Sequence, residues 1–184
     1  MLKEPGIELC VVFHRVLHNF VGNRVSVAGK PVKQLDCGNN LTHCWLWQTD
    51  PMSNLVAYVD GGSLGNPGPS GIGVVMDGAQ DGKIRIAKSI GRQDNNVAEY
   101  LALLEALQCA LTLRAKTLHV YSDSEVVVKQ MRGEYSCRSP RLYSLHWICR
   151  KLACSFQFSI SHIPRESNTE ANSLASSAVR KQFL

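Results

Sequence analysis

Residues 55–76, LVAYVDGGSLGNPGPSGIGVVM, carry the pattern that decides the fold. LVAYVD (55–60) is a short apolar run with β-branched residues, which is typical of a buried strand. The segment that follows (61–71) is rich in glycine and proline and indicates a turn. IGVVM (72–76) is a second apolar, β-branched run. The stretch therefore predicts two neighbouring strands of one sheet, with Asp60 at the end of the first.

The chain after residue 76 continues with strand-like and helix-like segments. IRIAKSI (84–90) follows a hairpin turn, and its alternation of apolar and polar residues is typical of a half-exposed strand. Residues 96–115 are rich in leucine and alanine and predict a helix, which Asp94 or Asn95 can cap. The further expected elements are a strand at 117–123, helices at 124–133 and 139–153, a strand at 156–163 and a helix at 168–181. Three antiparallel strands followed by alternating helices and strands predict an α/β fold, a five-stranded mixed sheet with helices on both faces.

Three carboxylates fall at matching places in this predicted fold. Asp60 ends the first strand, Asp123 ends the fourth, and Glu99 lies in the first turn of the first long helix. If the two strands are neighbours, the aspartates emerge side by side and the helix brings Glu99 over them. One aspartate at a strand end is usually a solvated turn residue, but three carboxylates forced together repel one another and indicate bound cations. Oxygen ligands without histidine or cysteine favour Mg²⁺ or Mn²⁺, and a pair of such ions serves phosphodiester displacement.

Glycines and side-chain amides accompany the carboxylates. The glycines of residues 60–71 let a ligand approach the backbone closely because they lack side-chain bulk. Asn95 and Asn96 stand just before Glu99, and such groups are suited to base edges, sugars and 2′-hydroxyls. Ordinary turn and capping chemistry explains each of these features taken alone.

Four motifs stand in order along residues 54–180: YVDGGSLGNPGPSG, NNVAEYLALLEAL, VYSDSEVVVKQMRGEY and HIPRESNTEANSLA. Together they resemble type 1 ribonuclease H, in the compact subgroup whose last motif reads roughly V-P-R-E-x-N-x-x-A-D. The resemblance implies a ribonuclease H-like fold. It also implies hydrolysis of the RNA strand of RNA/DNA hybrids at internal bonds, which leaves 5′-phosphate and 3′-hydroxyl ends.

The resemblance implies a ligand set as well. The family holds two divalent ions, Mg²⁺ or Mn²⁺, with an Asp-Glu-Asp-Asp set, and the motifs assign Asp60, Glu99 and Asp123 to the first three places. The fourth place holds Asn172, whose amide oxygen is still a legitimate ligand. Arg165 occupies the loop position where many bacterial members have a histidine, and we count it among the catalytic residues. We expect a working enzyme; the alternative is a hybrid-binding domain that cannot cut because its metal site is incomplete.

Residues 129–151 are basic and aromatic. Six lysines and arginines face a single acidic residue, Glu134, and Tyr135, Tyr143 and Trp147 stand between them. Such a composition suits a track for the phosphates of the DNA strand. It also fits an amphipathic helix with a solvated basic face, and we expect Trp147 to lie in the core. The residues that we assign to substrate binding are Gly61, Ser63, Asn66, Asn95, Asn96 and Arg138.

The composition describes a soluble globular protein. Apolar residues make up 45% and charged residues 19%, and the net charge of +5 favours a polyanionic partner only modestly. No apolar run approaches the ~18–20 residues that span a bilayer. The seven cysteines are odd in number and include no CxxC pair, so we expect a reducing, cytoplasmic setting, without membrane association or an obligate protein partner.

Residues 1–53 do not resemble the rest of the chain. We predict that they form an N-terminal extension of uncertain role and that 54–184 form the ribonuclease H domain. A secretory signal is not expected, because Glu4 and Glu8 interrupt the positively charged N-terminal region that a signal peptide has. Two interpretations remain open: a small accessory hairpin or helix, and a translation start at Met52.

Overall fold

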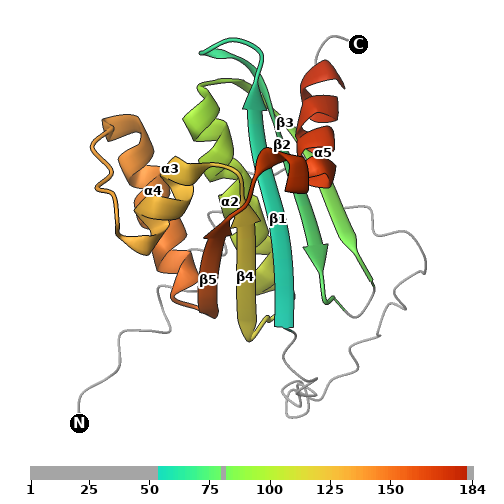
Figure 1. The fold of residues 1–184 in the computed structure, drawn as a ribbon, viewed down its shortest axis with the longest axis vertical. Helices are drawn as coiled ribbons and strands as arrows, with labels where there is room; N and C mark the ends of the chain where they lie inside the picture. The colour runs from blue at the N-terminus through green and yellow to red at the C-terminus, as the bar shows by residue number, and fades with distance from the viewer. Residues whose placement is uncertain (1–53, 80–81, 182–184) are drawn as a thin grey trace, which may run out of the picture. The chain divides into compact units, whose positions relative to one another are not determined.

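The five predicted strands pair into one mixed sheet in the computed structural model, which describes residues 54–79 and 82–181 (Figure 1). The strands are β1 (Asn54–Ser63), β2 (Gly68–Asp77), β3 (Ile84–Gln93), β4 (Thr117–Ser122) and β5 (Gln157–His162). The helices are α2 (Asn95–Thr112), α3 (Glu125–Arg132), α4 (Pro140–Ala153) and α5 (Thr169–Arg180), with a 3₁₀ turn, η1 (Arg165–Ser167), before α5. The predicted extension at residues 1–53 lies outside the described residues.

The strand order, β3-β2-β1-β4-β5, confirms that the first and fourth strands are neighbours. β1 pairs antiparallel with β2 on one side and parallel with β4 on the other. The parallel register ends with Val59 opposite Ser122, so Asp60 and Asp123 are the next residues along their chains. The sheet register alone therefore brings the two aspartates to one place, as the sequence predicts.

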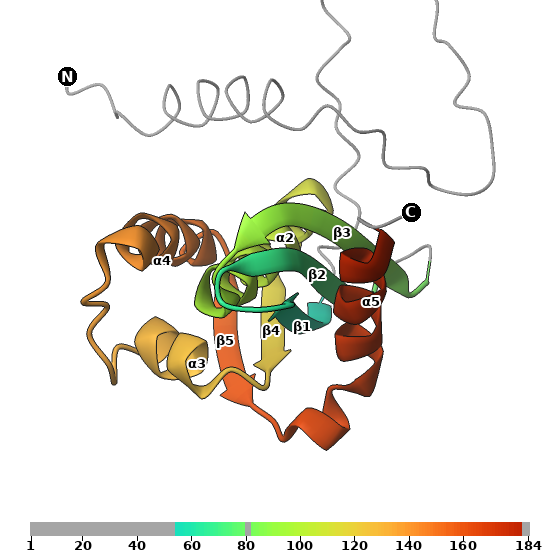
Figure 2. The same cartoon turned by 90° about the horizontal axis from the view of Figure 1, so that it is seen from above.

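Helices cover both faces of the sheet, as expected for this α/β class (Figure 2). α2 packs on β1 and β2 with α3 and α4 beside it, and α5 packs on β1, β2 and β3 from the opposite face. The core between the sheet and α2 is built from small and branched side chains, among them Val59, Leu103 and Leu107. Each of these is fully buried. None of the described helices combines the length and apolar character that crossing a bilayer requires.

The glycine-rich turn is shorter than predicted. Only residues 64–67 connect the strands, whereas Gly61, Gly71 and Gly73 lie within β1 and β2. A Cβ atom on Gly61 would stand 2.2 Å from the Ala98 carbonyl carbon of α2, and one on Gly73 would stand 2.0 Å from the Ala171 carbonyl oxygen of α5. These glycines therefore serve the close packing of helices on the sheet.

Two further expectations need correction. Trp147 does not lie in the core, because 49% of its surface is exposed on the outer side of α4, and Leu142 and Cys149 face inward instead. Asp94 occupies the N-cap position of α2, but its side chain makes no capping hydrogen bond and pairs with Arg141 of α4 at 2.6 Å. The helix start is thus tied to α4 by an ion pair.

Candidate active site

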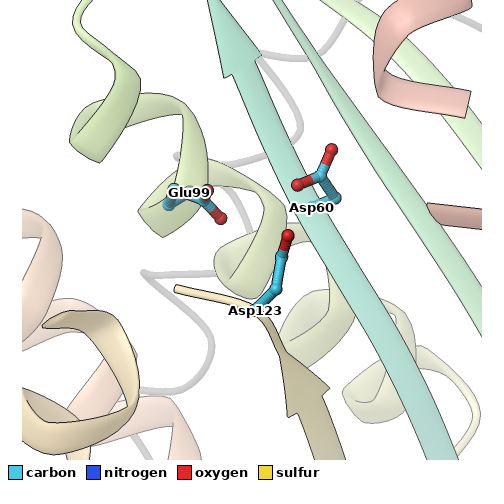
Figure 3. A group of neighbouring side chains, drawn as sticks. All are labelled: Asp60, Glu99 and Asp123. Carbon is cyan, nitrogen blue, oxygen red and sulfur yellow. The ribbon is translucent and has the colours of Figure 1, made fainter. Parts of the chain in front are cut away.

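Three carboxylates from three different elements converge at the end of β4 (Figure 3). Asp60 comes from β1, Glu99 from α2, and Asp123 from the residue that follows β4. One oxygen atom of each lies within 4.8 Å of the others. Glu99 lies just past the first turn of its helix and not within it, because α2 begins at Asn95, one residue earlier than predicted.

Close packing between β1 and α2 positions Glu99. The absence of a side chain at Gly61 lets the backbone at Ala98 and Glu99 approach the strand, and the Gly61 N–H donates a hydrogen bond of 3.3 Å to Glu99 Oε2. Glu99 is 7% exposed and Asp60 is 3% exposed. Two acidic groups are therefore held next to each other with little access to water.

This arrangement makes ionisation of the cluster unfavourable. Burial, and then the neighbouring Asp123 carboxylate, raises the pKa of Asp60 to about 6. Burial also raises the pKa of Glu99 well above its usual value, and the charges of Asp60 and Asp123 add to that effect. The Arg165 guanidinium lowers the pKa of both groups, so it lies close enough to offset part of the repulsion.

Asn168 is a site residue that the sequence did not single out. It is 1% exposed at the start of α5, and its Nδ2 group donates to the Val59 carbonyl oxygen at 2.9 Å and to Asp123 Oδ1 at 3.1 Å. It thereby joins α5 to the ends of β1 and β4. The N of the motif V-P-R-E-x-N-x-x-A-D falls at Asn168, and this is the signal that could have found it, whereas its position before a helix indicates only a cap.

Asn172 and Arg165 are brought together on the α5 side of the site. Arg165 Nη2 donates to Asn172 Oδ1 at 3.2 Å, and Ser176 Oγ lies 3.5 Å from the same oxygen. The side-chain oxygen predicted to bind metal is thus engaged by an arginine. His162 is the last residue of β5, and its Nε2 atom lies 3.3 Å from the Asp123 carbonyl oxygen.

Most of the predicted substrate-binding residues lie where the β1–β2 turn meets the start of α2. The Asn95 N–H donates to Asn66 Oδ1 at 3.1 Å, which joins the β1–β2 turn to the start of α2, where Asn96 is also exposed. Ser63 Oγ lies within hydrogen-bonding distance of the Gly65 and Gln93 carbonyl oxygens, at 2.6 and 3.0 Å. Arg138 is exposed in the α3–α4 loop, a different element from the other predicted residues.

The fold and the acidic cluster define the ribonuclease H-like class of α/β proteins, and comparisons with known proteins agree. A family model described as reverse transcriptase-like matches residues 58–178. Ribonuclease HI of Halobacterium salinarum is 33% identical over 168 residues, which cover 90% of this chain and 84% of that protein. A bifunctional protein of Mycobacterium tuberculosis is 39% identical over 128 residues, which cover 68% of this chain but 35% of that protein. The chain belongs to the ribonuclease H family of enzymes.

Solved structures support the same assignment. Ribonuclease H1 of H. salinarum matches with a TM-score of 0.66 and 36% identity, covering 70% of this chain and 98% of that one. LC11 ribonuclease H1, a protein isolated from compost by a metagenomic approach, has been solved in complex with an RNA/DNA hybrid. That complex matches with a TM-score of 0.65 and 34% identity, covering 71% of this chain and all of that one (100%).

Proposed function

We propose that the protein is a divalent-metal-dependent ribonuclease H that cuts the RNA strand of RNA/DNA hybrids internally. The products have 5′-phosphate and 3′-hydroxyl ends. The observation that carries this proposal is the convergence of Asp60, Glu99 and Asp123 within 4.8 Å. Support for the substrate comes from the relative that was solved with an RNA/DNA hybrid.

The cluster fits a pair of Mg²⁺ or Mn²⁺ ions by its chemistry. All three groups offer hard oxygen ligands, and two of them are buried carboxylates whose raised pKa reflects the cost of leaving their charges uncompensated. Asp60, Glu99, Asp123 and the amide oxygen of Asn172 would hold the ions. A pair of divalent ions held there would supply a more acidic water for attack on the phosphodiester and positive charge beside the leaving oxygen.

The chain's own groups supply position and selectivity. Asn168 fixes the orientation of Asp123, and the Gly61 N–H fixes that of Glu99. Arg165 is exposed beside the carboxylates and compensates part of their charge, which suits it to contact a substrate phosphate. Ser63, Asn66, Asn95 and Asn96 carry the donors and acceptors suited to sugar hydroxyls, and a 2′-hydroxyl is what distinguishes an RNA strand from a DNA strand.

A second function, hybrid binding without cleavage, is favoured by one observation. Asn172 brings no charge to the site, and its oxygen already accepts a hydrogen bond from Arg165. Three carboxylates nevertheless remain, and a substrate phosphate adds further oxygen ligands. We therefore favour the active enzyme.

One assay separates the two functions. The purified protein is incubated with labelled RNA/DNA hybrid, single-stranded RNA and duplex DNA, each with Mg²⁺, Mn²⁺ or EDTA. We expect cleavage of the hybrid's RNA strand alone, dependent on metal. Binding of the hybrid without cleavage in either metal would establish the second function, and cleavage that survives EDTA would contradict both.

A further inference from the structure

The outer face of α4 carries a row of aromatic and basic side chains, here named the α4 stripe. Its members recur at helical spacing along one side of α4, whereas Leu142, Cys149 and Ala153 lie on the other side and are buried. Tyr143 is 58% exposed and Trp147 is 49% exposed, although both rings belong to a well-packed helix. The stripe lines a groove of about 240 Å³ and consists of Tyr143, His146, Trp147, Arg150, Lys151 and Cys154.

The charged side chains of the α4 stripe are all basic. α4 contains no aspartate or glutamate, and no ion pair engages Arg150 or Lys151 within the described residues. Lys151 Nζ lies 5.5 Å from the centre of the Trp147 ring, so a cation stands at the edge of an exposed aromatic face. An acidic partner is complementary to this combination, and one with flat rings and phosphates is the best match.

The stripe lies apart from the acidic cluster. β5 runs parallel to β4, and α4, which precedes β5 in the chain, runs in the opposite direction. The first residues of α4 therefore lie toward the carboxylates and its last residues lie away from them (Figure 1). From Tyr143 to Cys154 the stripe is ~16 Å long at 1.5 Å per residue. A strand that leaves the active site along α4 would therefore meet Tyr143 first and Lys151 later.

We propose that the α4 stripe binds an unpaired nucleic-acid strand, such as the single-stranded tail that continues one strand of a hybrid beyond the cleavage site. Successive bases of an unpaired strand stack on Tyr143 and Trp147, and its phosphates face Arg150 and Lys151. A blunt duplex is a poorer partner because its bases are already stacked inside the helix and present no free faces. This surface goes beyond the proposed hydrolysis, since it touches no reacting group.

Direct binding measurements in EDTA test the proposal without any cleavage. The probes are labelled oligothymidine, oligouridine and a blunt DNA duplex of equal length, titrated by fluorescence anisotropy. The variants are Trp147→Ala, Tyr143→Ala and the ring-preserving Trp147→Phe. Leu111→Ala is the matched control, because it removes a 37% exposed apolar side chain from another helix. Circular dichroism establishes that each variant is folded.

We expect the wild-type protein to bind a single strand more tightly than the duplex. Trp147→Ala should weaken that binding by about fivefold or more, the effect of losing one stacked base, while Trp147→Phe and Leu111→Ala stay near wild type. The two single-stranded probes distinguish a DNA tail from an RNA tail. Equal affinity for the duplex, or full affinity in both alanine variants of the stripe, would overturn the proposal. Failure of the wild-type protein to cut hybrid would refute the proposed function and leave this result standing.

Discussion

At the scale of single residues, the site is a compromise between charge and burial. Asp60 and Glu99 are almost inaccessible to water, and that burial raises the pKa of both carboxyl groups. A structural role alone would be met better by neutral groups of the same size. The cluster is therefore retained at a cost to the stability of the metal-free protein, and a cation removes that cost.

Asp60→Asn should abolish hybrid cleavage and stabilise the metal-free protein. The folded-state pKa of Asp60 is about 6, against an ordinary 3.8, so the wild-type protein loses stability as the pH rises through this interval and stays less stable above it. A neutral amide avoids that loss, which amounts to as much as ~3 kcal/mol. Thermal unfolding in EDTA should show a higher midpoint for the variant at neutral pH, and the difference should shrink as the pH falls from about 6 and vanish below pH ~4. Hybrid affinity should be largely kept; cleavage by the variant would exclude Asp60 from the reaction.

Substitutions of Asn172 test whether its amide oxygen completes the set of metal ligands formed by Asp60, Glu99 and Asp123. Asn172→Asp adds a charge beside Arg165 and the cluster, which should favour a divalent ion by ~1 kcal/mol or more even with substantial screening. Half-saturating Mg²⁺ should fall in Asn172→Asp and rise in Asn172→Ala, which has no ligand oxygen. The measurement is a metal titration of hybrid cleavage for the three proteins. If Asn172→Ala matches the wild type throughout, the amide is not a ligand.

We expect Asn168 to act by orienting Asp123, to which its Nδ2 group donates a hydrogen bond. Asn168→Ala removes the donor that holds Asp123 and leaves the buried Val59 carbonyl oxygen without that bond, at a cost of ~1–3 kcal/mol in unfolding free energy. Loss of an orienting contact should also weaken Mg²⁺ binding by ~10–100-fold. Asn54→Ala is the matched control, since Asn54 joins β1 to Thr117 of β4 by a 2.9 Å bond at the other end of the strands. Equal Mg²⁺ requirements in both variants would leave Asn168 a purely structural residue.

At the scale of elements, the distance between β1 and α2 decides whether Glu99 reaches the site. Gly61→Ala would place a Cβ atom 2.2 Å from the Ala98 carbonyl carbon and 2.3 Å from the Glu99 backbone nitrogen. Because backbone must move to relieve this contact, we expect a loss of ~1–3 kcal/mol or more in unfolding free energy, together with slower cleavage. The control is Gly62→Ala, whose Cβ meets nothing within 4 Å. Denaturant unfolding should leave that variant within ~0.5 kcal/mol of wild type.

The elements also show what the sequence can and cannot predict. Periodicity and composition predicted all five strands and their order of appearance, and the parallel register then brings Asp60 beside Asp123 without further information. Gly61 and Gly71 were misassigned to a turn, because a close approach between distant backbones has no local signature. Trp147 was misplaced in the core for a similar reason: apolar character shows that a residue is able to be buried, but not which side of a helix finds a partner.

At the scale of the whole molecule, every helix and strand that the structure describes belongs to one layered α/β fold, a five-stranded sheet with helices on both faces. The ribonuclease H similarity lies in this part of the chain. The family model matches residues 58–178, and the match to the H. salinarum structure covers 98% of that protein's chain. The described residues supply the three carboxylates, the amides near them and the exposed stripe on α4. We therefore propose that residues 54–184 form the catalytic domain.

A protein that begins at Met52 should fold and cut hybrid at a rate close to that of the full chain. The reason is that β1 begins at Asn54 and the side chains assigned to the reaction all follow it. The chemistry is judged from the cleavage rate at saturating hybrid, and binding from the hybrid affinity measured in EDTA, so the two contributions are separated. Unchanged values for both would make residues 1–53 dispensable for this reaction. A normal saturated rate with a severalfold weaker affinity would instead identify these residues as a binding element, whereas a folded but inactive protein would contradict the proposed domain boundary.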